Sequence, residues 1–392
     1  MTGGRGLGEV IRLDDLSIRA WSPNEFLMST PSRSSVASVW DIVGYVALVL
    51  IAVVAAGLYF QDTTPPKPAE PAPVAPRVVV PPESLLDRLT RQARAGDVVS
   101  QRHLGEVYAN GMGVREDDVE AAKWFKMAAE KGDVISARIL GYFYASGDGV
   151  PKSDSEAVSW WRFAAGRGDA DAAYSLGVAY LKGDGVQASE AEGLSYCRLA
   201  ADRGNTWAQY YLGIWHYDGV LVTKSHKEAF YWFRKAALRG HPDAQNYLGV
   251  MYRDGESVSP SDVEAVRWFR FAASHHSGEG CHNLGQLLSA GRGADKDEAL
   301  ASAQFLKGAM LEHIPAQVEL ARRYLTGVGL TVDPAEAFAW YDVAASKGHA
   351  PAATTRDGMV RQLTSAQVAA GRERSAALLR DIASRKASRL RP

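Results

Sequence analysis

The sequence predicts an all-α fold: a solenoid of seven 36-residue helix pairs, preceded by one transmembrane helix and a Pro-rich linker. Three observations predict it. A leucine recurs every 36 residues from Leu104 to Leu320, glycines and other small residues recur at fixed offsets from it, and an uncharged apolar run occupies Ile42 to Phe60. A period of this length is typical of stacked repeats, in which each unit contacts only its neighbours.

The N-terminal part divides into a leader (1–41), an apolar run (42–60) and a linker (61–82). The leader shows no structural pattern and is expected to be disordered. The apolar run would span about 28 Å as a helix, close to the hydrocarbon thickness of a bilayer. A cleaved signal peptide is the alternative, and a start at Met28 would favour it. The long leader and long run favour an uncleaved anchor.

The linker is rich in proline and alanine and predicts an extended spacer of polyproline II character. Basic residues on the two sides of the apolar run nearly balance, so the positive-inside rule orients it only weakly. One span, a spacer and then a domain is the usual plan of an exported bacterial envelope protein. We therefore expect a single-pass protein of the inner (cytoplasmic) membrane with its repeats in the periplasm.

When the seven units are aligned, residues 36 positions apart fall in the same column. The leucines are Leu104, Leu140, Leu176, Leu212, Leu248, Leu284 and Leu320, each followed by glycine or alanine. An aromatic column follows, with Trp124, Trp160, Tyr196, Trp232, Trp268, Gln304 and Trp340. Paired small residues and, in five units, a closing glycine complete the pattern.

One unit reads as two antiparallel helices. Residues 97–110 form the first helix, and the glycines of 111–114 end it because glycine readily adopts positive φ. Asp117 or Asp118 is the candidate N-cap of the second helix, which ends at Gly132. A helix pair cannot bury its apolar face alone, so neighbouring units must stack.

The second unit shows the pattern most fully: Ala137, Leu140-Gly141, Tyr144, Gly147-Asp148-Gly149-Val150, Asp154, Ala157, Trp160-Trp161, Ala164-Ala165 and Gly168. This pattern resembles the Sel1-like repeat, a relative of the tetratricopeptide repeat, over about two thirds of the chain. The resemblance implies a right-handed α-solenoid with a non-catalytic scaffold or adaptor role in signalling regulation or envelope assembly. Units four and five lack the second turn glycine and carry Leu221 and Ser257 there, which puts the shape of those turns in question.

The solenoid is expected to span residues 83–349, with a half-repeat cap at 83–96 and seven repeats over about 97–349. Residues 350–392 should form two capping helices, 351–362 and 365 to about 384, with a basic tail. The tail reads as a solvated helix face or, alternatively, as a contact for lipid or an acidic protein. Its basic residues are Arg372, Arg374, Arg380, Arg385, Lys386, Arg389 and Arg391.

Several function classes find no support. The net charge of −1 and the lack of a basic stripe in the repeats argue against nucleic acid as a partner. No metalloprotease, serine-hydrolase or phosphate-loop motif occurs, so we expect no catalytic residues, no cofactor and no small-molecule substrate.

His275, His276, Cys281 and His282 are of metal-ligand types, but column replacement explains His276 and Cys281 better than a metal site does. Cys197, in the core aromatic column, is expected to be a buried thiol, and two cysteines make no disulfide framework.

Solenoids bind partners on the concave face, which the first helices line. By analogy with tetratricopeptide repeats, the exposed positions there are Tyr142, Tyr174, Leu181, Trp207, Tyr210, Ile214 and Tyr217, together with Val178 and Val250. The end units supply polar residues instead, namely Arg102, Glu106, Asn110 and Arg322. These aromatic side chains would bind a protein or peptide partner, or alternatively pack between repeats. The competing function is a polysaccharide-binding envelope assembly factor that uses the same rings as sugar-stacking platforms.

Overall fold

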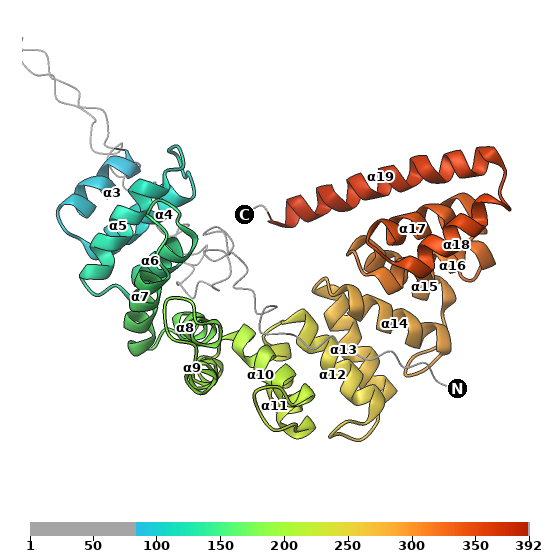
Figure 1. Cartoon of the computed structure of the whole chain (residues 1–392), viewed down its shortest axis with the longest axis horizontal. Helices are drawn as coiled ribbons and strands as arrows, with labels where there is room; N and C mark the ends of the chain where they lie inside the picture. Colours follow the sequence, from blue (N-terminus) through green and yellow to red (C-terminus); the bar gives the residue numbers. More distant parts are fainter. Residues whose placement is uncertain (1–83, 391–392) are drawn as a thin grey trace, which may run out of the picture.

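The computed structural model describes residues 84–390, which form seventeen α-helices and no strand (Figure 1). The first helices of the seven units are α4 (Val98–Ala109), α6 (Val134–Ser146), α8 (Ala170–Lys182), α10 (Thr206–Asp218), α12 (Pro242–Asp254), α14 (Gly278–Ala290) and α16 (Ile314–Thr326). The second helices are α5 (Asp118–Glu130), α7 (Asp154–Gly166), α9 (Glu190–Asp202), α11 (His226–Leu238), α13 (Asp262–Ser274), α15 (Glu298–Met310) and α17 (Pro334–Ser346). The all-α repeat solenoid is confirmed.

Side-chain caps fix where the helices begin. Asp97 accepts a hydrogen bond from the backbone N–H of Ser100 at 2.7 Å at the start of α4. Of the two candidates for α5, Asp117 is the N-cap, and it accepts from the N–H of Glu120 at 3.0 Å. Such caps satisfy N–H groups that have no partner within the helix.

The turns between the two helices of a unit depend on positive φ. A Cβ on Gly149 would collide with the backbone carbonyl of Asp118 in the preceding unit, so this turn packs directly on the neighbouring helix. Leu221 and Ser257 stand at the equivalent positions and keep left-handed φ values of 61° and 64°. The turn shape therefore survives without glycine, although a leucine there is strained.

The core consists of leucines, aromatic rings and small residues that recur in each unit. Phe125, rather than Trp124, is the fully buried ring of the first unit. In the first six units the glycine beside the leucine allows close approach, since a Cβ on Gly141 would overlap the ring of Trp161 and one on Gly213 the ring of Phe233. Tight helix packing thus explains these columns.

The units stack into an open arc (Figure 1). In its middle, α8 and α10 lie on the inner side and α9 and α11 on the outer side. The first helices α10, α12, α14 and α16 also contact one another from unit to unit, as expected on the inside of a curve. The inner face is therefore built from first helices.

Each end of the arc carries additional helices. At the N-terminal end, α3 (Leu85–Arg94) packs on α4, and the Gln101 side-chain amide donates to the carbonyl of Ala93 at 3.0 Å. At the other end, α18 (Ala350–Val360) and the long α19 (Ser365–Leu390) pack on α17. The sequence predicted an end near Ser384, so α19 is longer than expected.

The polar contacts of α19 bear on the basic C-terminal tail. Arg374 pairs with Glu336 at 2.5 Å, and Lys386 pairs with Glu312 at 2.8 Å. Two of the basic side chains in the tail therefore form ion pairs within the molecule.

Over residues 84–390, no helix combines the length and the apolar character that crossing a bilayer requires. The predicted leader (1–41), transmembrane helix (42–60) and linker (61–82) lie outside the described residues. They remain predictions from sequence.

Candidate partner-binding surface

The residues predicted for the concave face fall into two groups. Leu181 and Ile214 are 5% and 1% exposed, and Val178 and Val250 are buried as well. The prediction that these four side chains are exposed is wrong. Leu181 packs on Gly193 of α9, the second helix of its own unit, and Ile214 belongs to a buried cluster with Phe233 of α11 and Leu248 of α12.

The aromatic members are half-buried and therefore retain some exposed surface: Tyr142, Tyr174, Trp207, Tyr210 and Tyr217. Tyr142 stands apart from the others. Its hydroxyl lies 2.8 Å from the Ser175 hydroxyl, and its ring packs on Trp161 at a centroid distance of 5.5 Å. Its main role is to join α6 to α7 and α8.

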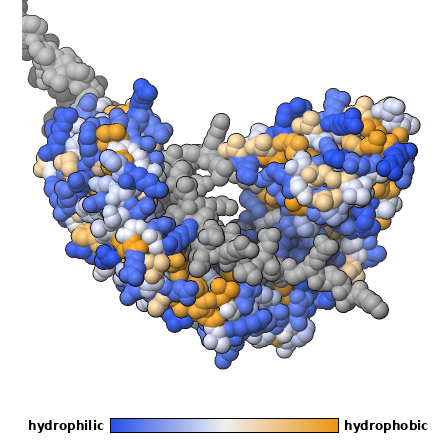
Figure 2. Space-filling view, in the orientation of Figure 1, coloured by the Kyte–Doolittle hydropathy of each residue, from blue (hydrophilic) through white to orange (hydrophobic). Residues whose placement is uncertain are grey.

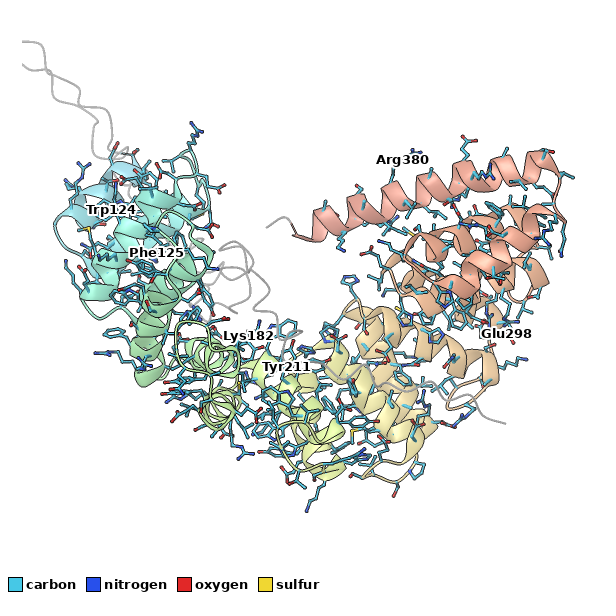
Figure 3. All side chains as sticks on the ribbon, viewed as in Figure 1. Trp124, Phe125, Lys182, Tyr211, Glu298 and Arg380 are labelled. Carbon is cyan, nitrogen blue, oxygen red and sulfur yellow. The ribbon has the colours of Figure 1, made fainter. Side chains whose placement is uncertain are left out.

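The remaining rings join with three others into one contiguous surface at the middle of the arc. We call this set the aromatic cluster, and its members are Tyr174, Trp207, Tyr210, Tyr211, Tyr217, His241 and Tyr247, from α8, α10 and α12. Tyr174 stacks on Tyr211 with centroids 6.2 Å apart, and Tyr217 meets Tyr247 edge-on at 5.5 Å. Figure 3 labels Tyr211 at the middle of the arc.

His241 lies within the aromatic cluster, in contact with Trp207 and Tyr210. It is the N-cap of α12, and its Nδ1 accepts from the N–H of Ala244 at 3.3 Å. Its ring stacks on Tyr210 at 4.3 Å and meets Trp207 edge-on at 4.7 Å. Burial lowers the pKa of His241 to about 4, so the ring is neutral at pH 7.

Tyr211, Tyr247 and His241 were missed by the sequence reasoning. Tyr211 and Tyr247 stand one residue before the leucine column, where the other units carry His103, Ile139, Ser175, Asn283 and Glu319. His241 replaces the aspartate or asparagine that caps the first four units. Two aromatics in a column that is otherwise not aromatic were the signal that could have found them.

Carboxylates border the aromatic cluster. Burial, followed by the nearby carboxylate of Asp243, raises the pKa of the Tyr210 hydroxyl well above its ordinary value. Glu279 on α14 also lies close enough to act on Tyr210 and Tyr247. The pKa of Glu279 is itself raised, chiefly by burial. The middle of the inner face is therefore aromatic and acidic.

The ends of the inner face are polar but internally paired. Near the N-terminal end, Arg102 binds Asp133 at 2.9 Å and Arg138 binds Asp171. Near the other end, Arg322 and Arg323 both bind Glu319. The pairs of Arg102 and Arg138 join first helices of successive units, whereas the pairs with Glu319 lie within α16.

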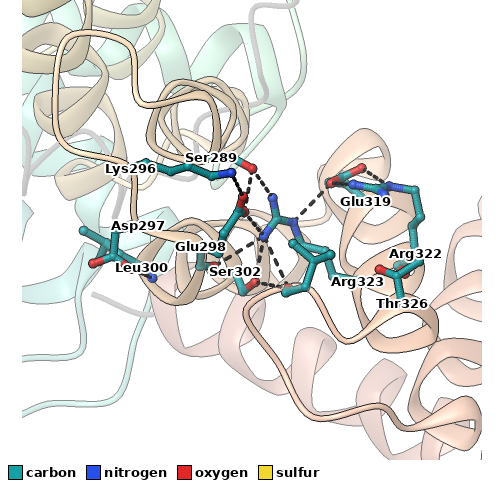
Figure 4. A network of polar contacts seen from close by, with 11 residues as sticks. Ser289, Lys296, Asp297, Glu298, Leu300, Ser302, Glu319, Arg322, Arg323 and Thr326 are labelled. Atoms are coloured by element: carbon teal, nitrogen blue, oxygen red, sulfur yellow. Dashed lines mark hydrogen bonds and ion pairs between the residues drawn. The ribbon is translucent and has the colours of Figure 1, made fainter.

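Arg323 is 1% exposed and stands where other units bury apolar side chains such as Trp215 and Met251 (Figure 4). It donates to Glu298 Oε2 at 3.1 Å and to the Ser302 hydroxyl at 3.0 Å. Hydrogen bonds from Ser289, first, and from cations including Arg323 lower the pKa of Glu298 to about 2. The network fixes α15 to α16.

The histidines and the cysteine near the junction of units five and six point to different neighbours. His275 Nδ1 lies 3.1 Å from Gln245 Oε1, whereas His282 packs beside Phe305 and His313. Within the described part of the chain, no group of three or more His, Cys, Asp or Glu side chains could hold a metal ion. Cys197 is buried, and burial raises the pKa of its thiol to about 12.

Comparison with known proteins agrees with this architecture. The Sel1 repeat model matches residues 98–133, 134–169, 170–205, 208–241, 242–277, 278–310 and 314–349. The crystal structure of a Sel1 repeat protein from Oxalobacter formigenes is 31% identical, with a TM-score of 0.58, over 70% of this chain and 79% of that one. No curated protein matches.

A second similar structure is c5321, described as a protective antigen of uropathogenic Escherichia coli strains with an SLR fold. It is 29% identical over 78% of this chain and 73% of its own, with a TM-score of 0.45. The seven repeat matches together span more than half of the sequence. The chain belongs to the Sel1 repeat family.

Proposed function

We propose that this protein is a non-catalytic scaffold or adaptor that binds a segment of a partner protein on its aromatic cluster. Sel1 repeat solenoids commonly mediate protein–protein interaction. The observation that carries the proposal is the cluster itself, in which half-buried rings from three successive first helices meet on the inner face of the arc. Large, partly exposed aromatic side chains are the usual anchors of protein interfaces.

The packing within the cluster favours a protein over a polysaccharide. A sugar-stacking platform needs a flat ring face that is open to the ligand. One face of Tyr210 is covered by His241, and Tyr217 is stacked on His226 at 5.0 Å. Tyr174 and Tyr211 similarly cover one another. Ring edges and hydroxyl groups are then the natural contacts, and these suit a polypeptide.

The sequence before the repeats supports membrane anchoring and a bacterial envelope role. The uncharged run at 42–60 has the length of a single span, and the Pro-rich segment 61–82 would hold the repeats away from the bilayer. On this proposal the protein is anchored in the inner membrane with its repeats in the periplasm. A reporter active only in the periplasm, fused after Pro392, should be active, and an inactive but stably produced fusion would refute this orientation.

Binding is tested by capturing envelope proteins with the full chain in mild detergent. The Trp207→Ala/Tyr210→Ala variant should lose the proteins that the natural chain retains, because it removes two anchors from the cluster. Tyr231→Ala is the matched control, since Tyr231 is 47% exposed on the outer helix α11. Identical protein sets from all three chains would defeat the proposal. Retention of a glycan without any protein would favour the polysaccharide alternative.

A further inference from the structure

The aromatic cluster offers hydrogen-bond donors as well as ring surface. Trp207, Tyr210 and Tyr247 are half-buried and contact their neighbours through their rings, and none of the three uses its indole N–H or hydroxyl in a hydrogen bond to residues 84–390. Burial raises the pKa of both tyrosine hydroxyls, so both keep their protons at neutral pH. A ligand that suits this surface is rich in hydrogen-bond acceptors and in apolar surface.

A proline-rich segment has this chemistry. Proline has no backbone N–H but keeps its carbonyl, so such a segment presents many acceptors and few donors. In the polyproline II conformation no backbone group is bonded internally, and the carbonyls are open to a protein donor. Grooves lined with aromatic rings recognise proline-rich segments in this form, which loses little entropy on binding because it is already extended.

The chain carries such a segment directly before its repeats. Residues 65–82 read PPKPAEPAPVAPRVVVPP, and helix α3 begins at Leu85. Within this segment Pro65, Pro68 and Pro71 stand three residues apart. Because polyproline II has three residues per turn, these three prolines would share one edge of the extended segment. The sequence therefore predicts a continuous proline edge that can lie along aromatic rings.

The segment is long enough to reach the aromatic cluster. Helix α3 packs on α4 at the N-terminal end of the arc, and α10 is the first helix three units further on (Figure 1). Stacked units advance by roughly one helix diameter, about 10–12 Å, so α10 lies roughly 30–40 Å along the inner face. Polyproline II rises about 3.1 Å per residue, so residues 65–82 would reach about 56 Å. Residues 65–71 can then meet the cluster while 72–82 cross the N-terminal units.

Covalent attachment makes even a weak contact effective. A binding segment joined to its site by a short linker has an effective concentration on the order of 1 mM. A segment that binds with a Kd of about 100 µM would then occupy the cluster in about nine molecules of ten. A separate partner must compete with this attached segment for the same rings.

We propose that the chain's own proline-rich segment, residues 65–82, binds the aromatic cluster when no partner is present, so that a partner must displace it. This inference rests on the proposed function, because it concerns how access to the same surface is regulated. The occupant is intramolecular, since the segment is attached directly before α3 and its length reaches the cluster within one molecule.

The test uses full-length chains in mild detergent and a fluorescein-labelled peptide with the sequence of residues 65–82, whose binding is measured by fluorescence anisotropy. A chain in which a Gly/Ser sequence of equal length replaces residues 65–82 should bind the peptide. The natural chain should bind it about tenfold more weakly, because its own segment competes. Adding Trp207→Ala/Tyr210→Ala to the Gly/Ser chain should abolish binding, whereas adding Tyr231→Ala on the outer helix α11 should not.

The matched control places the same Gly/Ser sequence at residues 11–28 and keeps the proline-rich segment, so it should bind the peptide as weakly as the natural chain. Circular dichroism melts confirm that each variant is folded. Equal affinity of the natural chain and the Gly/Ser chain, or no binding by the Gly/Ser chain, would overturn the inference. A natural chain that is dimeric and gains affinity for the peptide on dilution would show that a second copy supplies the segment, against the intramolecular assignment.

The two proposals fail in different ways. If the peptide does not bind but Trp207→Ala/Tyr210→Ala still loses captured envelope proteins, only the inference about the proline-rich segment is wrong. If the peptide binds as expected but the natural, Gly/Ser and Trp207→Ala/Tyr210→Ala chains capture identical sets of envelope proteins, the proposed function fails and the cluster binds its own segment alone.

Discussion

Two buried residues, Arg323 and His241, depart from the pattern of the other units. Arg323 occupies a core position in the last unit, and His241 replaces the usual acidic N-cap in the fifth. Burying a charge or a polar ring is costly unless hydrogen bonds compensate for it. Arg323 has carboxylate and hydroxyl partners, whereas His241 stays neutral, so the two residues should respond differently to substitution and to pH.

Replacing Arg323 by methionine should lower the free energy of unfolding by about 1–3 kcal/mol, because it removes charge-assisted hydrogen bonds to Glu298 and the buried Ser302. Arg322→Met is the matched control. Arg322 is about half exposed, and its pair with Glu319 should contribute less than about 1 kcal/mol. Urea unfolding followed by circular dichroism measures both, and equal effects would contradict the assigned role of Arg323.

The His241 ring should make stability depend on pH. Burial lowers its pKa from 6.5 to about 4, so the unfolded chain binds a proton more readily. Stability is then fully present above pH 6.5 and is lost as pH falls toward 4. The loss from this one residue should be on the order of 2 kcal/mol between pH 7 and pH 4.5.

His241→Asn should remove that part of the pH dependence while it keeps the cap, since Asn205 caps the preceding unit. Urea unfolding at both pH values provides the comparison. A variant whose stability falls with pH as steeply as that of the natural chain would show that His241 is not the source.

At the scale of elements, the turns join one unit to the next. Gly149 packs against the carbonyl of Asp118, and Ser257 holds the same left-handed backbone without the freedom of glycine. A non-glycine residue in this region costs roughly 1–2 kcal/mol. At this turn, units four and five therefore carry a local strain that the glycines of the other units avoid.

Ser257→Gly should raise the free energy of unfolding by about 1 kcal/mol, because it relieves this strain. The reverse exchange, Gly149→Ser, should lower it by at least about 2 kcal/mol, because it adds a steric collision to the strain. Urea unfolding of the two variants measures both changes. A destabilising Ser257→Gly would contradict the account of these turns.

The helices and the repeat were predictable because their signals are local and recur seven times. The cap at Asp117 and the glycine beside the leucine in six units are examples. Side-chain direction was less predictable. Leu181 and Ile214 were placed on the surface by offsets taken from another repeat, and the direction of a side chain depends on how the second helix packs. Tyr211 and Tyr247 stand out in the sequence as aromatics in an otherwise non-aromatic column, but their joining of one cluster depends on contacts between units.

At the scale of the whole molecule, the units form an open arc with the aromatic cluster in its middle and α19 at its C-terminal end, and hydrophilic residues cover much of both arms (Figures 1 and 2). Because each unit contacts mainly its neighbours, substitutions in the middle should leave the arms folded. Surface changes at the cluster can therefore be tested for binding without loss of the fold.

The most direct test of a partner on the inner face is site-specific photocrosslinking in cells. The photoreactive residue p-benzoylphenylalanine is placed at Tyr211 in the aromatic cluster and, as control, at Tyr231 on the outer helix α11. We predict that Tyr211 gives one discrete crosslinked protein adduct and that Tyr231 does not give this adduct. The same adduct from both positions, or none from Tyr211, would contradict binding on the inner face.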